Sequence, residues 1–363
     1  MTSLVHYSEF KYDLWNYLAS ENRPIVMYGM GNGADKIISV LDRYGIEVSD
    51  FFASDGFVRG QVFHGKTVLS FSDIKKKYND FIIILSFGSS LPDVLANIYN
   101  LADEYELYAP DVPVSGDTLF TLDFYKDNFE KFEKAFSLLS DDESKDIYNN
   151  IVKFKISGDI SYLRKAISPK TAEQELLNFD EYETFIDCGA YNGDTARKFI
   201  AEAKNASTVY AIEPDRKNFK KLSSYALAED KAKVIPLNFG VWDKHATAEF
   251  TVGGNRNSAI GTQNLRKTET VELNSVDSLD VHNADYIKYD VEGAEANALL
   301  GSVKTVAASS PDMLISLYHR SEDLFALPIL INELFAGYSL YLRRFEYVPA
   351  WDINLYAIKR RLA

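Results

Sequence analysis

The chain has 363 residues, 46% of them hydrophobic and 25% charged, which is enough apolar material for more than one core. Its net charge of −14 opposes binding to phosphate backbones, so we expect no nucleic-acid partner. The longest apolar run, FIIIL at 81–85, is too short to span a membrane. A single cysteine, Cys188, and an N-terminus without a signal-peptide pattern lead us to expect a cytoplasmic protein.

Residues 1–115 alternate short apolar runs with helical patterns, which predicts a parallel α/β unit. Strands are expected at 24–29, 47–55 and 81–88. The stretch HGKTVLSFSDI at 64–74 repeats the pattern of a strand followed by a helix. We therefore expect a small sheet with helices packed on it.

The turn after the first strand, YGMGNGADKI, carries Gly29, Gly31 and Gly33, and Asp55 ends the following strand. This G-x-G-x-G turn is a shortened dinucleotide fingerprint. It resembles the small Rossmann-like domains attached to sugar-modifying enzymes. Two hypotheses stay open: the unit binds a nucleotide or nucleotide-sugar, or it has lost that ligand and shapes the cleft of its neighbour.

Residues 116–180 have helical periodicity and many charges, which predicts a helical connector between two α/β units. A second unit occupies 181–363. Its parallel strands are expected at 183–187, 208–213, 233–238, 285–290 and 312–318, with an extra pair, AEFTV and ETVEL, around a glycine-rich loop.

The last two strands, YSLYLRRF and NLYAIKR, are joined by EYVPAWDI, which leaves no room for a crossover helix. Parallel neighbours need a crossover of about a dozen residues or more. We therefore expect an antiparallel hairpin at the end of an otherwise parallel, doubly wound sheet.

The loop FIDCGAYNGDT at 185–195 joins the first strand of this unit to a helix. Gly189 and Gly193 allow a sharp turn and a close approach of a ligand, and Asp187 ends the strand. The next strand ends in Glu213, whose carboxylate can accept hydrogen bonds from both hydroxyls of a ribose. The three-glycine cradle for a pyrophosphate is missing, so the pattern indicates S-adenosylmethionine.

The segments DCGAYNGDT, AIEPD, DYIKYDVEGAEANALLGS, LISLYHRSEDL and YSLYLRRF resemble the FkbM family of class I methyltransferases, over roughly 183–358. The resemblance implies a class I methyltransferase sheet and S-adenosylmethionine-dependent O-methylation of a sugar, polysaccharide or glycosylated metabolite. It also implies cofactor-binding roles for Asp187, Gly189, Tyr191, Gly193, Thr195, Glu213 and, beside the adenine, Asp243.

An alcohol is a poor nucleophile, so its methylation calls for a base or a metal. His319 and Asp290 follow adjacent strands, and a histidine pKa near 6.5 suits a general base. The hypothesis is that His319 deprotonates the acceptor while Asp290 or Glu292 orients it; a Mg²⁺ or Mn²⁺ ion at these two carboxylates stays open. Glu295 is expected to do no more than cap a helix.

Two further readings of the sequence remain. A nicotinamide-dependent sugar oxidoreductase or epimerase would use the N-terminal glycines, and a non-catalytic protein would only bind a nucleotide or nucleotide-sugar. Asn257 and Ser258, in the loop GNRNSAIG, are candidates for contact with the acceptor.

Overall fold

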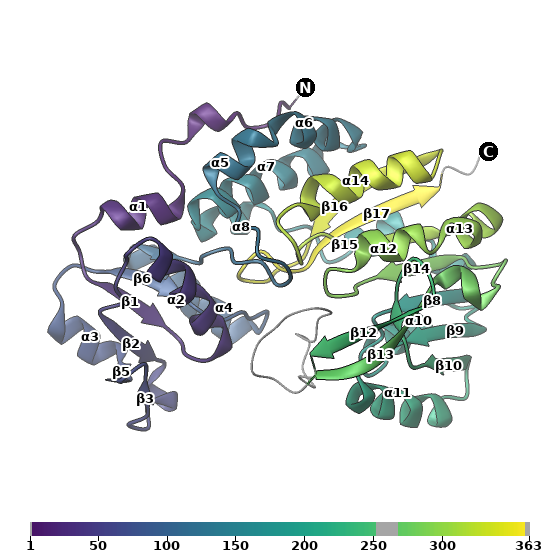
Figure 1. Cartoon of the computed structure of the whole chain (residues 1–363), viewed down its shortest axis with the longest axis horizontal. Helices are drawn as coiled ribbons and strands as arrows, with labels where there is room; N and C mark the ends of the chain where they lie inside the picture. The colour runs from purple at the N-terminus through teal and green to yellow at the C-terminus, as the bar shows by residue number, and fades with distance from the viewer. Residues whose placement is uncertain (1, 252–267, 360–363) are drawn as a thin grey trace.

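The computed structural model describes residues 2–251 and 268–359. Asn257 and Ser258 lie outside these residues. The chain forms two main sheets, one at the N-terminal end and a larger one in the second half, with a group of helices beside them (Figure 1). No helix in the described part of the chain is long and apolar enough to cross a membrane.

The N-terminal sheet is parallel, with strand order β5-β2-β1-β6-β7. Its central strands are buried on both faces because they consist almost wholly of apolar residues. The strands are β1 Ile25–Tyr28, β2 Asp50–Ala53, β5 Leu69–Ser70, β6 Ile82–Leu85 and β7 Leu107–Tyr108. The helices are α1 Leu14–Ser20, α2 Asn32–Arg43, α3 Phe71–Lys77 and α4 Pro92–Glu104.

One segment of this unit differs from the prediction. The stretch at 64–74 was expected to form one strand and a helix, but Val62–Phe63 (β3) and Lys66–Thr67 (β4) form a short antiparallel pair before β5. His64 and Gly65 both have positive φ angles and turn the chain, so this stretch forms a tight hairpin. The remaining predicted strands and helices of the unit are present.

The larger sheet has the order β10-β9-β8-β14-β15-β17-β16. Its first five strands are parallel, while β17 runs antiparallel to both β15 and β16. The doubly wound sheet with an antiparallel terminal hairpin is therefore confirmed. The strands are β8 Thr184–Cys188, β9 Thr208–Ile212, β10 Lys233–Leu237, β14 Tyr286–Tyr289, β15 Asp312–Ser316, β16 Tyr338–Arg344 and β17 Ile353–Lys359.

Helices cover both faces of this sheet (Figure 1). Alternate side chains of β8, such as Phe185 and Ile186, enter different apolar clusters because strand side chains alternate between faces. The helices are α10 Asp194–Glu202 and α11 Arg216–Ala228 on one face, and α12 Glu295–Leu300, α13 Val303–Ser309 and α14 Asp323–Leu334 on the other. The expected extra pair is present as β12 Ala246–Thr251 and β13 Thr268–Asn274, with β11 Gly240–Val241 beside β13.

The connector is helical, as predicted. It contains α5 Leu122–Asp127, α6 Phe129–Leu138, α7 Asp142–Ser157, α8 Ile160–Lys165 and α9 Ala172–Leu176. Helix α7 is capped by Asp141, whose carboxylate accepts a hydrogen bond from the Ser144 amide. Helix α6 packs against α14, and α7 packs against the edge strand β16. One apolar cluster joins Val26 of the N-terminal sheet, Phe132 of α6 and Ile287 of β14, so the core runs through all three parts.

Candidate active site

A cavity of about 520 Å³ lies at the carboxyl ends of β8, β9 and β14. The strand order of the sheet reverses between β8 and β14, which is where open α/β sheets bind their ligands. A second cavity, of about 370 Å³, shares part of its wall with the first. The shared residues are Thr195, Lys288, Asp290, Tyr318 and Asp352.

The glycine loop between β8 and α10 forms one wall of the larger cavity. Gly189 and Gly193 have φ angles of +94° and +87°, which disfavour other residues. A Cβ on Gly189 would lie 1.9 Å from the Asp290 carbonyl oxygen. The loop therefore needs glycine so that the ends of β8 and β14 can come together. This is in addition to the expected role of glycine, which is to let a ligand approach the backbone. Tyr191 and Thr195, expected at the cofactor, both line the cavity.

Glu213, the residue expected to accept hydrogen bonds from the ribose hydroxyls, follows β9 and lies in the cavity wall. Its two carboxylate oxygens accept hydrogen bonds from the backbone amides of Tyr191, at 2.8 Å, and Asp215, at 2.9 Å. Burial raises the pKa of Glu213 to about 8, against the opposing effect of these amides. The carboxylate is thus fixed in orientation, and each oxygen retains capacity for a further hydrogen bond.

Asp187 and Asp243 lie differently from Glu213. Asp187 is fully buried beneath the glycine loop, and both its oxygens lack a hydrogen-bond partner. Burial raises the pKa of Asp187 to about 7, although Lys288 on the neighbouring strand opposes the shift. Asp243 is absent from the described cavity lining, although Gly240 and Val241 belong to it. An adenine contact by Asp243 therefore remains only a prediction.

The ends of β14 and β15 bring the predicted catalytic residues together, as their adjacency in the sheet suggested. His319 Nε2 lies 3.6 Å from Asp290 Oδ1 and 3.7 Å from Glu292 Oε2. Asp290 also contacts the Lys288 ammonium at 3.0 Å and accepts a hydrogen bond from the Tyr318 hydroxyl at 3.1 Å. Burial would raise the pKa of Asp290, but Lys288 and His319 hold it below its usual value. Asp290 is therefore an ionised, already paired carboxylate.

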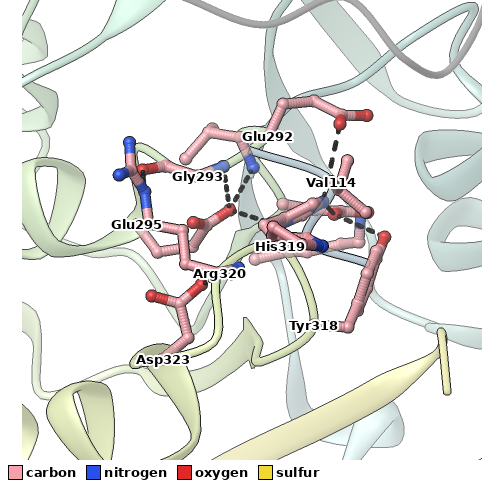
Figure 2. A network of polar contacts seen from close by, with 12 residues as sticks. Val114, Glu292, Gly293, Glu295, Tyr318, His319, Arg320 and Asp323 are labelled. Carbon is pink, nitrogen blue, oxygen red and sulfur yellow. Dashed lines mark hydrogen bonds and ion pairs between the residues drawn. The ribbon is translucent and has the colours of Figure 1, made fainter. Parts of the chain in front are cut away.

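The environment of His319 differs from the sequence-based expectation (Figure 2). The ring is fully buried, and its Nδ1 lies 2.9 Å from Glu295 Oε1. Burial alone would lower the pKa of His319, but Glu295, Glu292 and Asp290 raise it to about 10. The expected pKa near 6.5 is therefore wrong, and at neutral pH the ring is a charged imidazolium with no capacity to accept a proton.

Glu295 does more than the expected helix capping. Its carboxylate accepts hydrogen bonds from the Val291 amide at 2.9 Å and the Gly293 amide at 3.3 Å, in addition to its ion pair with His319 (Figure 2). It thus fixes both the 290–295 turn and the charged ring. The sequence offered no signal for this ion pair, because the two residues are on different elements.

Glu292 has the features of a proton acceptor. Its φ of +53° is unusual for a residue other than glycine, and its side chain reaches the cavity. Its Oε2 is buried without a hydrogen-bond partner. Burial raises the pKa of Glu292 to about 7, with His319 opposing and Asp290 adding to the shift. A carboxylate with this pKa exchanges protons near neutral pH.

Among residues 2–251 and 268–359, no group of three or more His, Cys, Asp or Glu side chains is arranged to hold a metal ion. Asp290 is already paired with Lys288 and Tyr318, and Glu292 adds only one further carboxylate. The Mg²⁺ or Mn²⁺ site that the sequence left open therefore does not fit this donor set.

The N-terminal glycine turn has a packing explanation at two of its three positions. A Cβ on Gly29 would lie 2.6 Å from the Phe87 ring, and one on Gly33 would lie 2.3 Å from the Ser86 carbonyl oxygen. Gly31 faces open space. Gly29 and Gly33 thus allow the turn and the start of helix α2 to approach the segment after β6 closely. Nucleotide binding by this turn remains a prediction.

Sequence reasoning missed cavity residues that come from distant parts of the chain. They are Ser90 and Val114, before the connector, and Tyr347, Trp351 and Asp352, between β16 and β17. Lys288 was missed as well, although a lysine within the apolar strand IKY was a visible signal. The other residues carry no local pattern, because tertiary contacts alone bring them to the site.

Comparison with known proteins matches this half of the chain to a family of methyltransferases. Residues 187–349 match the model of the methyltransferase FkbM domain. This chain therefore contains an FkbM methyltransferase domain. The matched region begins at Asp187 and includes Glu213, Asp290, Glu292 and His319. No curated protein sequence matches the chain.

Solved structures extend the likeness beyond the FkbM domain. The methyltransferase FkbM of Methylobacillus flagellatus KT superposes with a TM-score of 0.70 at 20% identity, covering 92% of this chain and 90% of that one. An rRNA methylase of Streptococcus thermophilus matches 54% of this chain and all of its own, with a TM-score of 0.33 and 13% identity. Aeropyrum pernix fibrillarin, solved with bound S-adenosyl-L-methionine, has the same TM-score and identity over 50% of this chain and 69% of its own. The first match covers both sheets, and at 20% sequence identity it establishes that the two proteins share a fold.

Proposed function

We propose that this FkbM domain transfers a methyl group from S-adenosylmethionine to a hydroxyl of a sugar, polysaccharide or glycosylated metabolite. The observation that carries the proposal is the fixed carboxylate of Glu213 in the cavity at the switch point of the sheet. The two hydroxyls of a ribose can donate hydrogen bonds to the two carboxylate oxygens of Glu213. Aeropyrum pernix fibrillarin, solved with bound S-adenosyl-L-methionine, offers an analogy for the choice of this cofactor.

The cavity residues fit this cofactor. Glu213 would hold the ribose hydroxyls, and the loop at Gly189 and Tyr191 would lie along the amino-acid end. S-adenosylmethionine, when bound, supplies a methyl group on a cationic sulfur. The carboxylates of Asp194 and Asp290 in the same wall favour a positively charged ligand.

We propose that Glu292 accepts the proton of the acceptor's hydroxyl. His319, which is charged, positions the turn that carries Glu292. Glu292 lines the cavity with an oxygen that lacks a hydrogen bond, and its pKa is about 7. The hydroxyl of the acceptor gives its proton to this carboxylate as its oxygen bonds to the methyl carbon; the bond from that carbon to the sulfur breaks, and a neutral thioether leaves. His319 holds the turn through Glu295 and, by its positive charge, limits the rise in the pKa of Glu292.

Titration calorimetry with S-adenosylmethionine tests the cofactor assignment. We expect Glu213→Ala to weaken binding about 10- to 100-fold, the loss expected when two hydrogen bonds worth about 0.5–1.5 kcal/mol each are removed. Glu130→Ala, on an exposed face of α6, is the control and should bind like the wild type. Equal affinity of the two variants would show that Glu213 does not hold the cofactor.

A further inference from the structure

The wall of the larger cavity is built jointly by the N-terminal unit and the FkbM domain. The Ser89 amide donates to the Val348 carbonyl at 2.8 Å, and the Val348 amide donates to the Ser89 carbonyl at 3.1 Å. This pairing holds the loop after β6 against the loop between β16 and β17, which reaches toward the N-terminal unit in Figure 1. Ser90 from the first loop lines the cavity.

Two aromatic rings, Tyr347 and Trp351, line the cavity at this junction. Their centroids are 5.3 Å apart and their planes are inclined by 33°. Both rings pack closely on Gly88, where a Cβ would lie 2.9 Å from Tyr347 and 3.1 Å from Trp351. Both are only partly buried. The N-terminal unit thus sets the position of an aromatic surface in the methyltransferase cavity.

Charge restricts what this surface can bind. The described residues that line the cavity include five carboxylates and one lysine, Lys288, with no arginine or histidine. The carboxylates are Asp194, Glu213, Asp290, Glu292 and Asp352. Ionised Asp290 makes this wall unfavourable for phosphates, and the carboxyl oxygens accept hydrogen bonds from hydroxyls. Asp352, the residue after Trp351, lines the same cavity and offers a hydrogen-bond acceptor there.

We propose that Tyr347 and Trp351 form the platform on which an uncharged pyranose ring of the methyl acceptor stacks, with Asp352 accepting a hydrogen bond from one of its hydroxyls. The C–H face of a pyranose is weakly positive and apolar, which complements the negative face of an aromatic ring. The inference rests on the proposed function and narrows its substrate class. A nucleotide-sugar, with a charged diphosphate, is disfavoured in this cavity.

The first test is transfer of radiolabelled methyl from S-adenosylmethionine to two acceptor panels. One panel contains the methyl glycosides of glucose, galactose, mannose and rhamnose, and the other contains UDP-glucose and UDP-galactose. We expect incorporation into at least one neutral glycoside. For that glycoside Trp351→Ala should raise KM about tenfold or more, and Trp351→Phe should stay within about threefold of the wild type.

Gly88→Ala tests the contribution of the N-terminal unit, since the added methyl group displaces both rings. It should raise KM for the glycoside several-fold. Gly56→Ala, where a Cβ meets open space, is the matched control and should leave KM unchanged. Calorimetric binding of S-adenosylmethionine should be the same in both variants and in Trp351→Ala, which also shows that they are folded.

Three results would contradict the platform. They are methylation of UDP-sugars alone, no labelled glycoside while S-adenosylmethionine still binds, and a KM that Trp351→Ala leaves unchanged. Failure of the wild type to bind S-adenosylmethionine would instead overturn the proposed function on which the platform rests.

Discussion

At the residue scale, Glu292 determines the expected pH dependence. Its carboxylate must be ionised to take a proton, and its pKa is about 7. We therefore expect kcat to rise as the pH increases through about 7 and to level off above it. Glu292→Gln should lower kcat by about 10²–10⁴ and remove this rise. A pH–rate profile with S-adenosylmethionine saturating is the measurement, and an unchanged rise in the variant would assign the base elsewhere.

The sequence predicted which residues meet at this site better than it predicted their protonation. Asp290 and His319 end adjacent parallel strands, so their proximity followed from strand order alone. The pKa of His319 depends on Glu295, which faces it from α12 after the turn that follows β14. Local patterns do not encode such a contact, and for that reason the sequence did not predict the raised pKa of His319.

At the scale of elements, a buried ion pair fixes the connector to the N-terminal unit. Lys155 of α7 lies 2.8 Å from Asp111, which follows β7, and both side chains are buried. Lys155→Ala would leave the Asp111 carboxylate buried without its partner, so we expect the free energy of unfolding to fall by about 3–5 kcal/mol. Urea denaturation measures this change.

The exposed pair Lys204 and Asp180, 2.6 Å apart, provides the control. Lys204→Ala should cost no more than about 1 kcal/mol, because solvent screens an exposed pair. Similar losses in the two variants would mean that the buried pair contributes no more than a surface one.

Element prediction succeeded where periodicity and connection length decide the structure. The hairpin of β16 and β17 followed from a connection too short for a crossover, and it is present. The pairing of Ser89 with Val348 was missed because it joins segments more than 250 residues apart and involves one residue from each. The short pair of β3 and β4 was missed because its two-residue strands are too brief to show a period.

At the scale of the whole molecule, the shared core predicts cooperative unfolding. One apolar cluster contains Ile83 of the N-terminal sheet, Phe154 of the connector and Ile315 of the larger sheet. We expect a single calorimetric transition for the full chain, shifted upward as a whole by S-adenosylmethionine. Two transitions, with only the upper one responding to the cofactor, would show that the N-terminal unit is energetically independent.

The most direct test of the account is to titrate the wild-type protein with S-adenosylmethionine and, in parallel, with NAD⁺. We predict saturable binding of S-adenosylmethionine at one site, because Glu213 and the glycine loop form a single cavity of matching chemistry. NAD⁺ should give no signal. Binding of NAD⁺ without S-adenosylmethionine would contradict the proposed function and move the chemistry to the glycine turn at Gly29–Gly33.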